Sequence, residues 1–294
     1  MTQPLTRVST DEERYLIPTP GPDETLRSVL MRVADLYQWN PSRLWALLQE
    51  AQGGAHSTID DPSPADMERL ACRLAVGRGR LDRLRLSDGD TFLAPEARCT
   101  YCPQCWREDD LAGRPRHFRR RWAGVFAIRC AQHGMPLFLW HRARGRFAPG
   151  MHDDISMPEL VWQATTAVPE ALDALRALVD FADTVGACLS DNGLWPANWL
   201  GDAGQARELL AEVMAVDALG NPPLIVSAQA PLAMRTLVHS GRALADAGLK
   251  DGWRRLRQAG DPGVRRMALW LVGAWLVPTW PAHFQPSVRM PKRP

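Results

Sequence analysis

Apolar residues recur at intervals of three and four along the first part of the chain, which predicts a series of short amphipathic helices. The first is expected over residues 26–37. A second is predicted to begin at Asn40-Pro41, because asparagine caps helices and proline suits their first turn, and a third is expected over residues 67–74. Three short helices joined by tight turns fit a helix-turn-helix, although most such clusters are only packing units.

The pattern changes twice further along the chain. Residues 80–93 alternate weakly between apolar and polar positions and contain the turn dipeptide Asp88-Gly89, so short strands are predicted there. Beyond Pro158 the spacing is helical again, interrupted by prolines and glycines. Long helices are expected at residues 171–189, 203–219, 232–247 and 264–277.

These patterns predict a mainly α-helical protein in three parts. An N-terminal helical region covers residues 1–95, a small zinc-binding module covers residues 96–150, and a helical C-terminal domain covers residues 151–294. The longest apolar run has eleven residues, whereas a bilayer span needs about 20. The first twenty residues are polar and lack the apolar core of a signal peptide. We therefore expect a cytoplasmic protein that does not enter a membrane.

Composition adds little until the position of the charges is considered. The 294 residues are 46% hydrophobic and 23% charged, with a net charge of +2, as in an ordinary globular protein. However, residues 98–146, the arginine-rich segment, hold eleven arginines and three acidic residues, a net charge of +8. A strongly positive segment in an otherwise faintly acidic chain is typical of a surface that binds a polyanion.

Two short cysteine motifs lie within this segment. Cys102 and Cys105 form a C-x2-C pair, and Cys130 and His133 form a C-x2-H pair after 24 intervening residues. Two such pairs, called hooks below, are typical of a tetrahedral zinc site, and four protein ligands leave no position open for water. We therefore predict one structural Zn2+, with buried thiols that bind no metal as the alternative. Cys99 also forms a C-x2-C pair with Cys102, but the proline after Cys102 favours the later pair.

Other cysteines and arginines are predicted to be structural. Cys72 and Cys188 lie among alanines and leucines and are expected to be small core residues. A second group of arginines is expected on the solvent-exposed face of two C-terminal helices: Arg254, Arg255, Arg257, Arg265 and Arg266.

Arginine suits phosphate recognition because its planar guanidinium donates paired hydrogen bonds. The candidate nucleic-acid contacts are Arg107, Arg116, Arg119, Arg120, Arg121 and Arg144. Phe118 and Trp122 flank the densest run, where they can stack on bases or anchor the loop. The alternative is a solvated arginine surface that pairs with acidic residues elsewhere in the fold.

No motif indicates catalysis. A nucleic-acid deaminase needs an H-x-E motif, but Ser57 and Thr58 follow His56. The chain also lacks the G-x-x-x-x-G-K-[ST] loop of nucleotide motors. We therefore do not expect an enzyme.

Two blocks of the sequence resemble the TniQ family of transposition proteins. The first is PGPDETLRS at residues 20–28, which leads into a helix with Arg32; Thr25 replaces the family's usual serine. The second combines YCPQCWRED at residues 101–109, HFRRRW at residues 117–122 and CAQHG at residues 130–134. Many members have a second cysteine finger after this point, but His141 and the arginines beyond it stand there instead, so a single zinc site is expected.

The resemblance implies a non-catalytic targeting factor. Such a protein binds target DNA or a nucleoprotein such as a CRISPR effector. It then recruits an AAA+ ATPase regulator, which in turn brings in the transposase. The alternatives are a stand-alone zinc-containing DNA-binding regulator that uses the first three helices, and a scaffold that binds only proteins. The sequence leaves open whether the chain forms a homodimer.

Overall fold

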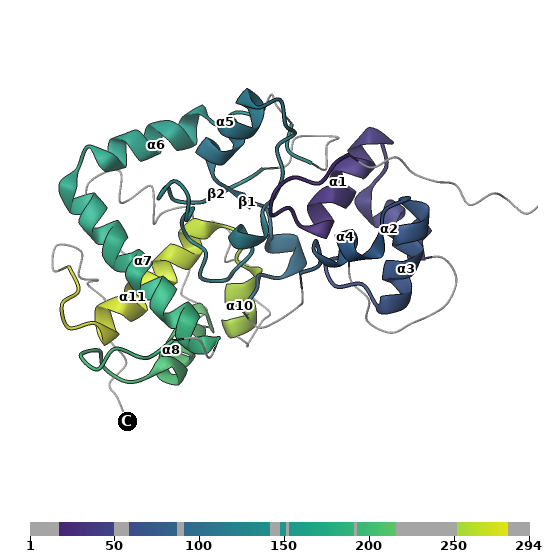
Figure 1. Cartoon of the computed structure of the whole chain (residues 1–294). Helices are drawn as coiled ribbons and strands as arrows, with labels where there is room; N and C mark the ends of the chain where they lie inside the picture. Colours follow the sequence, from purple (N-terminus) through teal and green to yellow (C-terminus); the bar gives the residue numbers. More distant parts are fainter. Residues whose placement is uncertain are drawn as a thin grey trace, which may run out of the picture. The chain divides into compact units, whose positions relative to one another are not determined.

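The computed structural model describes residues 18–49, 59–86, 91–141, 148–150, 153–190, 193–215 and 252–281 (Figure 1). The chain divides into two compact units, of which unit 1 comprises residues 1–88 and 142–150 and unit 2 comprises residues 89–141 and 151–294. The three-part division drawn from the sequence stays a prediction about domains. In the structure, the segment that contains the cysteines lies in the same compact unit as the C-terminal helices.

The mainly α-helical fold is confirmed. The described residues form ten α-helices, two short 3-10 helices and one two-stranded sheet. The helices of unit 1 are α1 (Leu26–Leu36), α2 (Pro41–Gln49), α3 (Pro64–Arg73) and α4 (Arg78–Asp82). Those of unit 2 are α5 (Pro103–Leu111), α6 (Ser156–Thr166), α7 (Pro169–Leu189), α8 (Ala203–Ala215), α10 (Gly252–Gln258) and α11 (Pro262–Leu276). The 3-10 helices are η1 (Pro95–Ala97) and η2 (Arg120–Trp122), and the sheet pairs β1 (Thr100–Tyr101) with the antiparallel β2 (Phe138–Leu139).

The long helices that are described lie close to where the apolar spacing predicts them. The prediction of short strands over residues 80–93 is wrong for the first residues of that range. Residues 78–82 form α4 instead. Leu81 and Leu84 are three positions apart and both are buried in the core of unit 1, which is helical spacing. The helix predicted at 203–219 is described as far as Ala215, and the one predicted at 232–247 lies outside the described residues.

Unit 1 is a cluster of short helices around one apolar core. The inward side of α1 contributes Leu26, Leu30 and Val33, which pack with Leu70 of α3. The α1 helix begins where the hydroxyl oxygen of Thr25 accepts the backbone N–H of Ser28 at 3.2 Å. Such a cap satisfies one of the N–H groups that a helix start leaves without a partner.

A buried carboxylate organises the chain just before α1. Glu24 is 1% exposed, and its oxygens accept the backbone N–H of Gly21 at 2.7 Å and the hydroxyl of Ser28 at 2.8 Å. The guanidinium of Arg32 lies 3.3 Å from the same carboxylate. Burying a charge is costly unless it is paired and hydrogen-bonded, so the PGPDETLRS block has a structural explanation in unit 1.

The core of unit 2 joins the cysteine-containing segment to the C-terminal helices. Leu93, Val125 and Ile128 belong to the same buried cluster as Phe181 of α7 and Trp270 of α11. The α10 and α11 helices pack against α8, and α11 also packs against α7 (Figure 1). The cysteine-containing segment therefore shares its apolar core with residues of α7, α8, α10 and α11, which follow it in the chain.

The prediction that Arg265 and Arg266 lie on a solvent-exposed helix face is wrong. Arg265 is fully buried and Arg266 is 4% exposed. The Nη1 atom of Arg265 lies 3.0–3.1 Å from the carbonyl oxygens of residues 124, 125 and 127, and Nη1 of Arg266 lies 2.9 Å from that of Leu137. Burial lowers the pKa of Arg265 to about 9 and that of Arg266 to about 10, so both remain cationic near neutral pH.

The core prediction for the isolated cysteines is also wrong for Cys72, which is exposed on α3, while Cys188 is half-buried on α7. Cys72 occupies the outer side of a helix whose inward side carries Met67 and Leu70. Among the described helices, none combines the length and the apolar character that a bilayer span would require.

Candidate metal centre and arginine-rich segment

The four residues of the paired hooks meet at one point in unit 2. Their ligand atoms, the Sγ atoms of Cys102, Cys105 and Cys130 and a ring nitrogen of His133, all lie within 4.8 Å of one another. The Nδ1 atom of His133 is 3.5 Å from Sγ of Cys102, 3.3 Å from that of Cys105 and 3.7 Å from that of Cys130. The Sγ atoms of Cys105 and Cys130 are 3.6 Å apart.

These separations fit a tetrahedral zinc ion. Zinc bonds of about 2.3 Å to sulfur and about 2.0 Å to nitrogen place tetrahedral ligand atoms roughly 3.5–3.8 Å apart. The three thiols are fully buried, so the set is a closed Cys3His group of the kind that binds metal for structural purposes. Cys99 lies outside this group, and its thiol is 3.8 Å from the carbonyl oxygen of Glu96.

The local backbone brings the two hooks together. Cys102 caps α5, whose first residue is Pro103, so Cys105 lies in the first turn of that helix. In the second hook, the backbone N–H of Gly134 donates to the carbonyl oxygen of Cys130 at 2.8 Å, with a φ of 67° at Gly134. Glycine adopts this left-handed conformation at low cost. The pairing of β1 with β2 then holds the chain before the first hook beside the chain after the second.

The thiols of this group do not ionise independently. Hydrogen bonding to Cys105 and Cys130, together with burial, raises the pKa of the Cys102 thiol. Hydrogen bonds from Cys102 and Cys105 lower the pKa of the Cys130 thiol. Three adjacent buried thiolates would repel one another, and a divalent cation offsets that repulsion, so metal binding would displace thiol protons.

Polar side chains surround the outer side of the site. The Nε2 atom of His133 lies 2.9 Å from Oε1 of Glu108, and the other carboxylate oxygen accepts a hydrogen bond from Gln132 at 2.9 Å. Neither Glu108 nor Gln132 was predicted from the sequence to be a functional residue. The signal available for Glu108 was its position three residues after Cys105, which puts both on the same side of a helix.

Two of the predicted nucleic-acid contacts are interior residues. Arg116 and Arg119 are each 4% exposed. Arg116 binds the carboxylate of Asp110 at 2.8–3.2 Å, and Arg119 binds that of the fully buried Asp109 at 3.0–3.1 Å. The structure therefore gives both guanidinium groups internal ion pairs, and their contact with nucleic acid stays a prediction.

The other predicted contacts are more accessible where they are described. Arg107 is exposed on α5 and forms an ion pair with Glu159 of α6. Arg120 is half-buried, and Arg121 is exposed, with its Nη2 atom 2.9 Å from Oε1 of Gln132. Arg144 lies outside the described residues.

The aromatic residues of the segment anchor it. Phe118 is 4% exposed and Trp122 is 1% exposed, so neither presents a face on which a base can stack. The rings of Tyr101 and Trp106 are stacked with centroids 3.9 Å apart, and burial raises the pKa of Tyr101 to about 12. The guanidinium of Arg119 lies over the Trp122 ring, 5.2 Å from its centroid.

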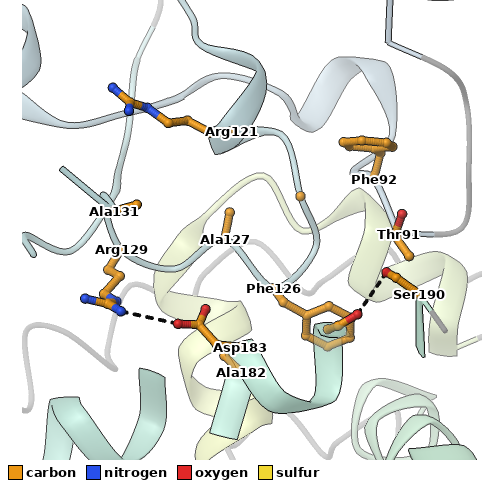
Figure 2. A pocket seen from close by; sticks show the side chains of 12 residues that line it. Thr91, Phe92, Arg121, Phe126, Ala127, Arg129, Ala131, Ala182, Asp183 and Ser190 are labelled. Carbon is orange, nitrogen blue, oxygen red and sulfur yellow. Dashed lines mark hydrogen bonds and ion pairs between the residues drawn. The ribbon is translucent and has the colours of Figure 1, made fainter. Parts of the chain in front are cut away.

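A hollow of about 370 Å³ lies between residues 121–131 and α7 (Figure 2). At its rim, Arg129 points toward Asp183 of α7, with 3.3 Å between Nη2 and Oδ2. The hydroxyl of Ser190 donates to the carbonyl oxygen of Gly186 at 2.9 Å. The Arg121 guanidinium points away from the other lining residues, so the polar groups here do not converge on a common point.

Comparisons with known proteins bear on the first half of the chain. No curated protein and no solved structure matches the chain. A family model described as TniQ matches residues 15–137, a range that includes the Glu24 network and all four residues of the Cys3His group.

Proposed function

We propose that this protein is a non-catalytic targeting adaptor. A TniQ family model matches residues 15–137, and the TniQ family consists of transposition targeting and adaptor proteins. In this proposal it binds target DNA or a nucleoprotein complex and recruits an AAA+ regulator, which in turn brings in the transposase. The family match supports a general role in transposition. The residues of unit 2 support the metal site and the nucleic-acid contacts that we propose for this role.

The observation that carries the proposal is the closed Cys3His group within the arginine-rich segment. Four protein ligand atoms within 4.8 Å would complete a tetrahedral coordination sphere, which leaves no position for a water nucleophile or a substrate. Thiolate and imidazole ligands in this geometry favour zinc among the divalent metals. The ion would then stabilise the segment rather than perform chemistry.

The charge of the segment supports a polyanionic partner. It carries a net +8, and the burial of Arg116 and Arg119 leaves Arg107, Arg120 and Arg121 as the described arginines from our candidate set with the best access to solvent. Lysine and arginine contacts with phosphate position a protein on nucleic acid without reading its sequence. We therefore propose that unit 2 supplies positioning contacts and that target choice depends on a partner.

Replacing Arg121 with alanine tests this contact. We expect the variant to bind every duplex several-fold more weakly than the wild type, with the slope of log affinity against log salt reduced by about one, because one fewer phosphate is neutralised. Arg176→Ala is the matched control, since Arg176 is 73% exposed and pairs with Asp173 on α7. Fluorescence anisotropy with unrelated duplexes at several salt concentrations measures both quantities.

The same titration separates the alternatives. A stand-alone regulator would prefer one duplex over the others by orders of magnitude, which would contradict a partner-dependent adaptor. A scaffold that binds only proteins would show no affinity for DNA at low salt. Recruitment is tested by a pulldown in which the purified, folded full chain is the bait for the AAA+ regulator. Failure of the folded chain to capture the regulator would contradict the adaptor role.

A further inference from the structure

The two nitrogens of the His133 ring have different surroundings. Nδ1 lies 3.3–3.7 Å from the Sγ atoms of Cys102, Cys105 and Cys130, while Nε2 lies 2.9 Å from Oε1 of Glu108. An ionised carboxylate only accepts hydrogen bonds, so Nε2 carries the hydrogen. The lone pair of Nδ1 is then left facing the thiols, which is the tautomer that a metal ion at their centre needs.

The second carboxylate oxygen of Glu108 continues the hydrogen-bonded chain outward. It accepts from Nε2 of Gln132 at 2.9 Å, and Oε1 of Gln132 in turn accepts from Nη2 of Arg121 at 2.9 Å. Because a carboxylate only accepts and a guanidinium only donates, the two neighbours fix the orientation of the Gln132 amide between them. The same Nη2 atom lies 3.9 Å from Sγ of Cys105, which returns the chain of contacts to the ligand group.

From this arrangement we propose that Glu108 is a positioning residue of the metal centre and that it links the centre to Arg121. Glu108 fixes the tautomer and the ring orientation of His133, and through Gln132 it holds the exposed guanidinium of Arg121 beside the site. The inference rests on the proposed zinc site and deepens the proposed nucleic-acid contact. Zinc binding and the placement of Arg121 become parts of one hydrogen-bonded arrangement.

The neighbouring acidic residue, Asp109, differs from Glu108 in burial and in its partner. Asp109 is fully buried and binds Arg119 inside unit 2. The Glu108 side chain is 39% exposed, and hydrogen-bonded pairs at such positions contribute little to folding stability. Removal of the Glu108 carboxylate should therefore change the metal site while leaving the fold of the metal-loaded protein intact.

The experiment measures metal affinity in the purified full chain. Competition of zinc(II) against a chromophoric chelator should show a loss of about 10- to 100-fold for Glu108→Ala, the usual effect of removing a carboxylate that orients a histidine ligand. Glu108→Gln should recover part of the loss, because its amide oxygen still accepts from Nε2. Asp173→Asn is the control, since it removes one exposed carboxylate whose ion pair with Arg176 lies on the surface of α7.

The cobalt(II) absorption spectrum gives a readout that a general loss of stability would not produce. For Glu108→Ala at saturating cobalt we expect altered ligand-field bands with retained thiolate-to-cobalt absorption, because the sulfur ligands stay and the histidine ligand loses its orientation. A wild-type spectrum together with wild-type zinc affinity in Glu108→Ala would overturn the proposal. Absence of metal from the wild type would instead overturn the zinc site itself, so the two failures are distinguishable.

The link to Arg121 has a separate test. Gln132→Ala should keep the wild-type cobalt spectrum and bind duplex DNA as weakly as Arg121→Ala does, because the guanidinium loses the amide that holds it. If Gln132→Ala binds DNA as tightly as the wild type while Arg121→Ala does not, the proposed link through Gln132 is wrong.

Discussion

Cys105→Ala is expected to abolish stoichiometric zinc binding and to unfold the segment that contains the cysteine hooks. Cys105 is fully buried and lies 3.3 Å from Nδ1 of His133 and 3.6 Å from Sγ of Cys130. Structural zinc sites contribute on the order of 10–16 kcal/mol in small zinc domains, which is as large as the whole stability of many proteins, about 5–15 kcal/mol. Metal analysis after gel filtration, together with thermal unfolding, measures both effects.

Cys99→Ala is the matched control for this prediction. Cys99 precedes the hook by three residues, but its thiol lies against the carbonyl oxygen of Glu96 rather than in the Cys3His group. The control should retain one zinc per chain and the wild-type melting temperature. Loss of zinc from Cys99→Ala, with retention in Cys105→Ala, would show that the ligand set is assigned to the wrong pair.

Replacing Arg265 with methionine is expected to destabilise unit 2 by about 2 kcal/mol or more. The Nη1 atom of Arg265 is within 3.1 Å of the carbonyl oxygens of Gly124, Val125 and Ala127. Methionine fills the space without donating a hydrogen bond. The carbonyl oxygen of Gly124 still accepts the backbone N–H of Ala127, whereas those of Val125 and Ala127 lose the Arg265 donor, at a cost of about 1–3 kcal/mol for each buried acceptor left without one. Urea unfolding followed by tryptophan fluorescence should show a lower midpoint with little change in slope.

Arg176→Met controls for the loss of a positive charge, since the Arg176 side chain is 73% exposed and its ion pair is on the surface. It should leave the midpoint nearly unchanged, because exposed pairs contribute only about 0–1 kcal/mol. An Arg265→Met variant as stable as the wild type would mean that the carbonyl groups of residues 124–127 do not depend on this guanidinium.

The features that the sequence predicts well are those set by short spacing. The three- and four-residue recurrence of apolar side chains predicts α1, and the closed Cys3His group follows from two hooks with two residues between ligands. Both depend on neighbours within a few positions. The α4 helix was missed because its five residues offer only one turn of pattern.

The burial of the arginines depends on partners distant in the chain, which spacing does not reveal. Arg119 meets Asp109 ten positions away, and Arg265 meets carbonyl groups almost 140 positions away. One local signal was available for Arg265 and Arg266. They directly precede the longest apolar run, residues 267–277, and a helix that is apolar on all sides is a buried helix, so arginines within its first turns are drawn into the interior.

The shared core of unit 2 also arises from distant partners. The sequence motifs and the family match end near residue 137, yet Val125 and Ile128 pack in one cluster with residues of α7 and α11. A domain boundary placed where the motifs end misses such packing, because the identity of an apolar residue does not reveal which distant residues it packs against.

Native mass spectrometry of the full chain at neutral pH is the most direct test of the proposed Cys3His zinc centre. We expect one zinc ion per chain, with a mass increase smaller than that of zinc alone because thiol protons leave when the metal binds. A folded chain that carries no metal after purification with zinc present would contradict the Cys3His centre and the role built on it.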